Sequence, residues 1–145
     1  MTVAGPCPRD SASAPTDSGC DDHHVGLTVV IVDDHPGFRR MARALLEADG
    51  FTVLAEAPDG DAAVEACERL DPDIVLLDVV LPGEDGFAVC ARLSAKGLSR
   101  PAVVLTSTRP ATAYSSQLRT SPCRAFVSKE QLTGAALRAV YEPDT

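Results

Sequence analysis

Short apolar runs alternate with amphipathic segments along most of the chain. Each run is rich in branched residues and too short for a helix, which is the pattern of a strand buried on both faces of a parallel sheet. Strands are predicted over residues 27–32, 51–57, 73–78, 101–105 and 124–128. The third run, Asp73-Ile74-Val75-Leu76-Leu77-Asp78, ends in a single carboxylate, and a turn with Pro82, Gly83 and Gly86 follows it.

Between these runs, apolar residues recur three and four positions apart, which predicts helices with one buried face. Pro36 begins the first helix, where its missing N–H costs nothing, and Gly50 ends it. Helices are expected at about residues 36–50, 60–70, 84–95, 109–120 and 132–140. The fourth is the weakest, because only Ala113, Tyr114, Gln117 and Leu118 suggest a face.

The alternation of strands and helices predicts an α/β fold. Right-handed crossovers between successive strands require a parallel sheet that helices cover on both faces. We expect a doubly wound, five-stranded parallel sheet in the flavodoxin-like order 2-1-3-4-5, which places the first and third strands side by side. The domain is expected over residues 26–142, after a disordered, proline-broken tail at 1–25 and before a short C-terminal tail at 143–145.

Charge and composition argue against several classes of function. The net charge of −8 argues against direct binding to nucleic acid, which needs a basic surface. No apolar stretch matches a signal peptide or a membrane span, so we expect a cytoplasmic protein without membrane attachment. The five cysteines lack C-x-x-C spacing and are expected to be small core residues rather than disulfides or a zinc site.

Polar side chains follow several of the predicted strands at the point where each strand ends. Asp33 and Asp34 follow the first strand, Asp78 the third, Thr106 the fourth and Lys129 the fifth. The carboxyl ends of parallel strands share one edge, and the first and third strands flank the topological switch point. Crowded carboxylates repel one another, and a hard divalent cation such as Mg²⁺ relieves that repulsion while leaving room for phosphate oxygens. The pattern predicts a carboxylate nucleophile that attacks phosphorus.

Each of these residues also has a simpler interpretation. A lone Asp after a strand is often a helix cap or turn residue, Thr106 is compatible with an ordinary strand position, and Lys129 with a solvated charge. Their joint occurrence at four strand ends favours the phosphoryl site. The acidic and histidine-containing segment Asp21-Asp22-His23-His24 is not expected to form a defined metal site, because its residues are adjacent on a flexible tail.

Four motifs together resemble a response-regulator receiver domain. They are Val-Asp-Asp after the first strand, Leu-Leu-Asp-Val-Val-Leu-Pro-Gly-Glu-Asp-Gly-Phe at the third, Leu-Thr-Ser at the fourth and Phe-Val-Ser-Lys at the fifth. The resemblance covers about residues 27–141. The start Val-Asp-Asp-His-Pro-Gly-Phe-Arg, and the acidic Glu130 after Lys129, are most similar to the NarL/FixJ-like subtype.

The resemblance implies a role for each site residue. Asp78 would accept a phosphoryl group from a sensor histidine kinase or a small acyl-phosphate. Mg²⁺ would be held by Asp34, Asp78 and the backbone carbonyl of Val80, with Asp33 helping directly or through water. Thr106 and Lys129 would bind the phosphoryl oxygens. Phe126 would be the aromatic switch that turns inward when Thr106 moves; the alternative is a packed core aromatic.

The resemblance also implies how the signal leaves the domain. The output face would comprise the helix at 109–120, the strand at 124–128 and the last helix, with an unknown protein partner and with homodimerisation left open. Such a receiver is not an enzyme beyond catalysing its own phosphorylation and dephosphorylation. No helix-turn-helix follows, so the chain is either a stand-alone receiver or a fragment of a longer DNA-binding regulator. The tail that begins at Met1 and the end of the chain just past the last helix favour the stand-alone form.

The sequence departs from the family at two places, and two other functions compete with the receiver role. Glu130 stands where many receivers have a cis proline, and Ser121-Pro122-Cys123 stands where Gly-Ala is frequent, so the sequence departs from the family next to the predicted output face. One competitor is an interaction module that works without phosphorylation. The other is a metabolic phosphotransferase of haloacid-dehalogenase type, which Val80 disfavours because that family has a second Asp there.

Val80 and Thr108 offer no group to orient a hydrolytic water, which predicts slow to moderate self-dephosphorylation.

Overall fold

The computed structural model describes residues 27–97 and 101–141. The expected disordered tail at 1–25, with its Asp21–His24 segment, lies outside these residues, and so does the C-terminal tail at 143–145. Within the described part of the chain, no helix is long and apolar enough to cross a bilayer. The described cysteines, Cys67, Cys90 and Cys123, are free thiols, and the first two are buried as expected for core residues.

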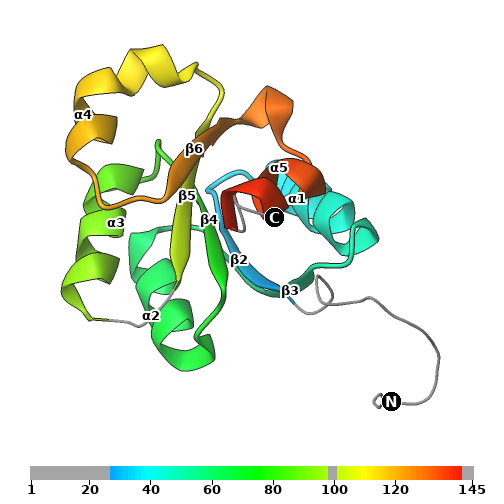
Figure 1. Cartoon of the computed structure of the whole chain (residues 1–145). Helices are drawn as coiled ribbons and strands as arrows, with labels where there is room; N and C mark the ends of the chain where they lie inside the picture. The colour runs from blue at the N-terminus through cyan, green and yellow to red at the C-terminus, as the bar shows by residue number, and fades with distance from the viewer. Residues whose placement is uncertain (1–26, 98–100, 142–145) are drawn as a thin grey trace.

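The strands form one parallel sheet in the predicted order (Figure 1). Its members are β2 (Thr28–Val32), β3 (Thr52–Ala57), β4 (Ile74–Asp78), β5 (Ala102–Ser107) and β6 (Ala125–Ser128). The spatial order β3-β2-β4-β5-β6 corresponds to 2-1-3-4-5 along the described chain, so the predicted fold is confirmed. Val32 pairs with Leu77, which brings the ends of β2 and β4 together.

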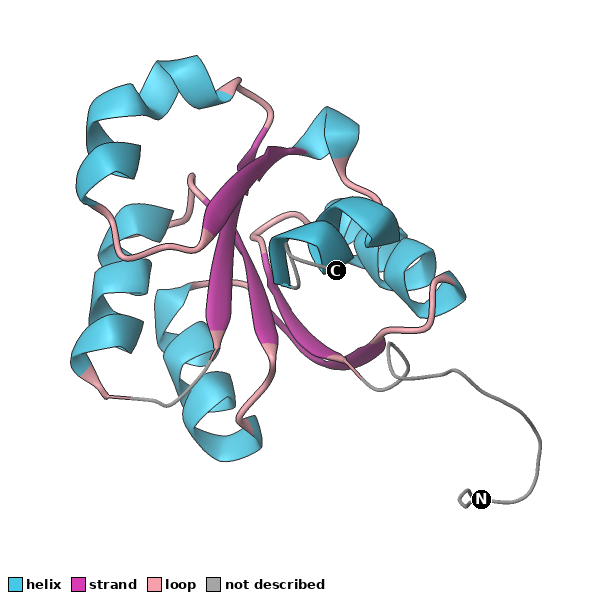
Figure 2. Cartoon of the chain, viewed as in Figure 1, coloured by secondary structure: helices cyan, strands magenta, loops and turns pink. Residues whose placement is uncertain are grey.

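Helices cover both faces of the sheet (Figures 1 and 2). The described residues form α1 (Pro36–Ala48), α2 (Gly60–Leu70), α3 (Gly86–Ala95), α4 (Ser115–Thr120) and α5 (Gly134–Tyr141), together with the short 3₁₀ turns η2 (Ala111–Tyr114) and η3 (Lys129–Gln131). Helices α1 and α5 lie on one side, and α2, α3 and α4 on the other (Figure 1). The alternation of side chains along β4 serves both layers, since Val75 and Leu77 pack toward α2 and α3 while Ile74 and Leu76 pack toward α1 and α5.

The helix expected at 109–120 is wrong as a single element. A 3₁₀ turn occupies its first half and α4 has only six residues. Pro110 is the N-cap of the turn and Tyr114, at the junction, has a non-helical backbone, so hydrogen bonding of α type begins only at Ser115. The junction directs the Tyr114 side chain into the core, where it is 8% exposed.

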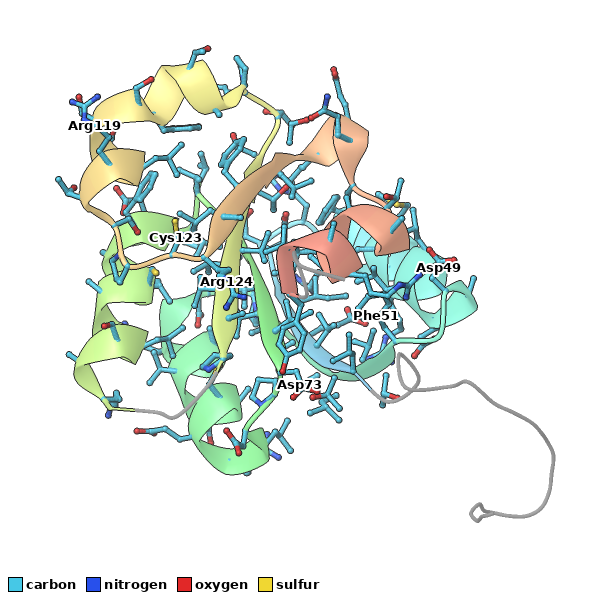
Figure 3. All side chains as sticks on the ribbon, in the orientation of Figure 1. Asp49, Phe51, Asp73, Arg119, Cys123 and Arg124 are labelled. Carbon is cyan, nitrogen blue, oxygen red and sulfur yellow. The ribbon has the colours of Figure 1, made fainter. Side chains whose placement is uncertain are left out.

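Asp73 and Asp78 lie at opposite ends of β4 and have different environments. The Asp73 carboxylate accepts hydrogen bonds from the Thr28 backbone N–H at 2.9 Å and the Thr28 hydroxyl at 3.0 Å, so it joins β2 to β4 at the amino edge (Figure 3). Asp78 lies at the carboxyl edge of the sheet, where the loops after β2 and β4 lead into α1 and α3. Asp73 therefore stabilises the pairing of β2 with β4, and Asp78 lies at the edge where open α/β sheets bind their ligands.

Candidate functional site

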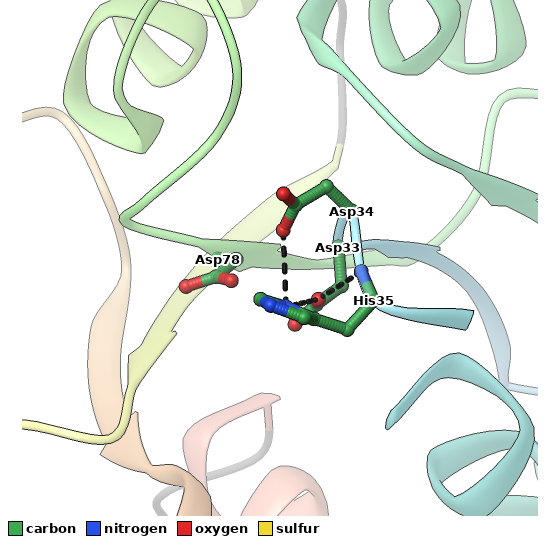
Figure 4. A group of neighbouring side chains, drawn as sticks. All are labelled: Asp33, Asp34, His35 and Asp78. Atoms are coloured by element: carbon green, nitrogen blue, oxygen red, sulfur yellow. Dashed lines mark hydrogen bonds and ion pairs between the residues drawn. The ribbon is translucent and has the colours of Figure 1, made fainter. Parts of the chain in front are cut away.

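The carboxyl edge of the sheet gathers three carboxylates and an imidazole. The ligand atoms of Asp33, Asp34, His35 and Asp78 all lie within 4.8 Å of one another (Figure 4). Asp78 and Asp33 are 3% and 0% exposed, whereas Asp34 is exposed. The predicted convergence of the first and third strand ends is therefore present, with Asp33 as the buried member of the Asp pair.

Lys129 enters this cluster from the end of β6. Its Nζ lies 2.7 Å from Asp33 Oδ2 and 3.3 Å from Asp78 Oδ2, so one ammonium contacts both buried carboxylates. The same ammonium lies 4.2 Å from the centre of the Phe38 ring on α1, close enough for a cation–π contact. Lys129 points into the site rather than into solvent.

The backbone around Asp33 holds its side chain in place. The His35 backbone N–H donates to Asp33 Oδ1 at 2.8 Å, an Asx turn that begins α1. A guanidinium N–H of Arg39 donates to the Asp33 carbonyl oxygen, and the Asp33 N–H donates to the Ala57 carbonyl at 3.0 Å. Asp33 thus combines the turn role suggested by its sequence position with a place in the charged cluster.

Burial and charge act differently on the three central groups. Burial, reinforced by the charge of Asp33, raises the pKa of Asp78 to about 6 even though the Val80 N–H donates to its carboxylate. Burial also opposes ionisation of Asp33, but hydrogen bonds from Lys129 and the His35 backbone outweigh it and hold its pKa below the usual value. Burial likewise opposes the charged form of Lys129, yet its contacts with Asp33 and Asp78 raise the pKa of the ammonium. The Lys129 ammonium is shared by the carboxylates of Asp33 and Asp78, and the charge of Asp78 is the less completely neutralised.

The structure places the remaining predicted residues around Asp78. Thr106 pairs with Asp78 across β4 and β5, is fully buried, and its Oγ1 has no hydrogen-bond partner in the described residues. Val80 is 62% exposed, and its N–H donates to Asp78 Oδ1 at 3.2 Å. Phe126 is half-buried and lies 5.9 Å from Tyr114, centre to centre, so it packs inside rather than projecting outward.

This donor set fits a hard divalent cation. It supplies carboxylate oxygens from Asp33, Asp34 and Asp78, and Mg²⁺ takes one or two carboxylates with water and phosphate oxygens completing its shell. Burial, with the charge of Asp33 added to it, raises the pKa of Asp78, and a bound cation would lower that pKa. The unpaired Thr106 hydroxyl adds a donor for an anionic oxygen.

Three residues at the site were not identified from the sequence as site residues. His35 and Phe38 belong to the motif that follows the first strand, but motif position alone does not show which way a side chain points. Tyr114 was assigned only to a weak helix face. Its hydroxyl lies 2.9 Å from Ser107 Oγ, next to Thr106, and its ring lies between Phe87 and Phe126.

Comparison with known proteins agrees with this geometry. The family model of the response regulator receiver domain matches residues 29–141. A transcriptional regulator of Pseudomonas aeruginosa is 39% identical over 103 residues, which are 71% of this chain and 49% of that protein. The nitrate/nitrite response regulator protein NarP of Escherichia coli is 44% identical over 79 residues, 54% of this chain and 37% of that protein. The chain thus spans about half the length, or less, of these curated relatives.

A solved structure shows the same architecture. The signal receiver domain of the response regulator NarL from Mycobacterium tuberculosis has a TM-score of 0.70 and 33% identity, with 80% of this chain and 97% of that chain covered. The family match covers nearly all of the described residues, and relatives of NarL type recur in both comparisons. The chain therefore belongs to the response regulator receiver domain family and is of the NarL/FixJ type.

Proposed function

We propose that Asp78 accepts a phosphoryl group from a phosphohistidine of a sensor kinase, or from a small acyl-phosphate, with Mg²⁺ as cofactor. A carboxylate oxygen of Asp78 forms the new P–O bond while the bond from phosphorus to the donor nitrogen or oxygen breaks. The leaving group keeps that electron pair. The observation that carries the proposal is the approach of Lys129 to both Asp78 and Asp33 at the carboxyl edge of the sheet.

The residues around Asp78 have complementary roles in this transfer. Mg²⁺ held by Asp33, Asp34, Asp78 and the Val80 carbonyl would neutralise the phosphoryl oxygens and the carboxylates together. Lys129 lies 3.3 Å from Asp78 Oδ2, so it can pair with a phosphoryl oxygen after transfer. Thr106 offers an otherwise unpaired hydroxyl from the neighbouring strand. The protein catalyses only its own phosphorylation and dephosphorylation and is no enzyme toward another substrate.

The switch follows from the charge that phosphorylation adds. A phosphoryl group brings strong acceptor oxygens to the edge of β4 and draws the Thr106 hydroxyl toward it. Tyr114 is bonded to Ser107, next to Thr106, and its ring packs against Phe126, so movement of β5 reaches α4 and β6. The surface of α4, β6 and α5 then binds an output protein, with no direct contact to nucleic acid.

Intact mass spectrometry tests the phosphoacceptor. After treatment with acetyl phosphate and Mg²⁺, the protein is expected to gain the mass of one phosphoryl group, and D78N is expected to gain none. D73N is the matched control, because it changes a carboxylate at the other end of the same strand and should retain the mass gain. No gain in the parent protein would favour an interaction module that works without phosphorylation. A gain that survives D78N would show that Asp78 is not the phosphoacceptor.

A further inference from the structure

His35 is held beside the carboxylates by its place in the sequence. The next residue is Pro36, which disfavours a helical backbone at the residue before it, and His35 is extended at φ −101° and ψ 109°. It is the N-cap position of α1, but its side chain makes no capping hydrogen bond. The imidazole is therefore not required to begin the helix. Instead, its Nδ1 is within hydrogen-bonding distance of the Asp33 carboxylate, which turns the ring toward the cluster.

The ring nitrogen of His35 lies between two carboxylates. Nδ1 is 3.0 Å from Asp33 Oδ1 and 3.0 Å from Asp34 Oδ1 (Figure 4). Neighbouring ligands of an octahedral ion with bonds of about 2.1 Å are about 3.0 Å apart. The three atoms therefore already have the mutual spacing of ligands on one ion, and Asp78 supplies a fourth ligand atom within 4.8 Å.

A second feature marks this place as a binding site. Thr106 is fully buried and its Oγ1 has no hydrogen-bond partner within the described chain. Thr106 and Asp78 are paired residues of neighbouring parallel strands, so their side chains project from the same face. A buried hydroxyl without a partner beside the carboxylates indicates that the site is completed by something other than protein.

We propose that His35 is a nitrogen ligand that enables this site to take a divalent transition-metal ion such as Mn²⁺. Imidazole is a good ligand for first-row transition ions, whereas Mg²⁺ prefers oxygen ligands and water. With Mn²⁺ bound, Nδ1 stays in the first coordination shell; with Mg²⁺ bound, the ring, which is on a side chain 69% exposed, turns out to solvent. The inference deepens the proposed function, because it concerns the ion that the phosphoryl site uses.

The experiment needs a background without competing imidazoles. His23 and His24 lie outside the described residues, so the parent protein for the test carries H23A and H24A, which leaves His35 as its one histidine. Mn²⁺ is added, and pulsed electron paramagnetic resonance measures the ¹⁴N modulation that a coordinated imidazole produces. Free Mn²⁺ measured in a titration gives the affinity, and Mg²⁺ competition against Mn²⁺ gives the ratio of the two affinities.

The H23A/H24A parent is expected to show ¹⁴N modulation, and H35A in the same background is expected to lose it. The preference for Mn²⁺ over Mg²⁺ should fall by about tenfold or more in H35A, since even an outer-shell partner is worth that much to a metal site. H35N is a second variant that keeps a polar residue at the helix N-cap and should behave like H35A. A parent without ¹⁴N modulation, or variants with an unchanged Mn²⁺ to Mg²⁺ ratio, would overturn the inference.

These readouts separate the inference from the function on which it rests. Mass gain on Asp78 in Mg²⁺ without ¹⁴N modulation in Mn²⁺ would overturn the role of His35 alone. Modulation and a histidine-dependent affinity ratio without any mass gain on Asp78 would overturn the phosphotransfer role while leaving the metal ligand in place.

Discussion

Gly86 lies against the backbone carbonyl oxygen of Asp78. A Cβ at Gly86 would collide with that oxygen and would lie 2.9 Å from the Cα of Val79. The Gly86 N–H also donates to the Val79 carbonyl at 2.7 Å, so the first residue of α3 is fastened to the loop that carries the phosphoacceptor. Only glycine allows this approach, because the neighbouring atoms belong to backbone that has no room to yield.

Gly86→Ala is therefore expected to destabilise the protein by about 1–3 kcal/mol, the usual cost of overpacking. Gly37→Ala is the matched control, because no heavy atom lies within 4 Å of a Cβ added there. Gly37 is in α1, so alanine should stabilise by about 0.5–1 kcal/mol. Urea unfolding of the two variants measures the difference, and a Gly86→Ala protein as stable as Gly37→Ala would show that the contact relaxes without cost.

The raised pKa of Asp78 predicts a pH-dependent stability in the metal-free protein. Below about pH 4 the carboxyl is protonated in both the folded and unfolded states and contributes nothing. Between about pH 4 and 6 the unfolded chain ionises while folded Asp78 keeps its proton, so stability falls as pH rises toward its folded pKa of about 6. Asp78→Asn removes this loss and should be more stable by about 1–3 kcal/mol near pH 7.5.

Urea titrations in a chelator at several pH values test this expectation. The advantage of Asp78→Asn should shrink as pH falls toward about 4, and added Mg²⁺ should stabilise the parent more than the variant. An advantage that stays constant across this range would show that the substitution acts through packing and not through the charge of Asp78.

Removing the shared cation should expose the repulsion between Asp33 and Asp78. Lys129→Met is expected to cost about 2–3 kcal/mol in metal-free buffer at neutral pH, because it leaves buried carboxylates without their partner. The cost should be smaller in an Asp78→Asn background, where one of the two charges is already gone. A double-mutant cycle from urea unfolding gives this coupling.

Lys96→Met provides the reference for Lys129→Met. Lys96 pairs with Glu68 at 2.9 Å, but both side chains are nearly half exposed, so its loss should cost less than about 1 kcal/mol. Equal costs for the two lysine substitutions would mean that the ion pairs of Lys129 are as weak as a surface pair.

The part of the site that could be predicted is the part that topology determines. Parallel strands joined by right-handed crossovers must bring their carboxyl ends to one edge, so the meeting of Asp78, Thr106 and Lys129 follows from where each apolar run stops. The switch from branched apolar residues to a polar one marks those ends in the sequence. Strand limits agree with the structure to within one or two residues for this reason.

The remainder depends on side-chain orientation and on contacts between distant segments. Adjacent Asp33 and Asp34 look equivalent in the sequence, yet only Asp33 turns inward to Lys129. His35 facing the carboxylates is a matter of rotamer, which residue spacing does not encode. The Phe38 ring under Lys129 joins residues far apart in the chain. Tyr114 is buried because a short 3₁₀ turn replaces a regular helix, and weak amphipathicity could not show that.

Tyr114→Phe tests the link between β5 and the α4 region. The Tyr114 hydroxyl lies 2.9 Å from Ser107 Oγ, which also accepts the Arg109 backbone N–H at 3.1 Å. Losing this buried bond should cost about 0.5–1.5 kcal/mol. Hydrogen exchange at the Arg109 amide should accelerate relative to the Ala102 amide, which bonds to Asp73 at the opposite edge. Unchanged exchange at Arg109 would show that the hydroxyl does not hold this loop.

Val80 and Thr108 predict how long the phosphorylated state lasts. Val80 is 62% exposed beside Asp78, and Thr108 is also exposed. Neither side chain is a long acid or amide, so neither can align a water for attack on phosphorus. The phosphorylated protein should therefore decay slowly to moderately, and its loss can be followed by intact mass after the phosphodonor is removed. Complete decay within seconds would contradict this expectation.

A substitution at position 80 tests whether dephosphorylation is slow because no side chain there orients the attacking water. Val80→Gln adds an amide at the mouth of the site and should accelerate decay on the order of tenfold, through orientation of the attacking water. Val80→Ala is the control, since it also removes the valine side chain but adds no hydrogen-bonding group. If the alanine and glutamine variants decay at the same rate, access of water to phosphorus sets the lifetime, and the chemical nature of residue 80 has no part in it.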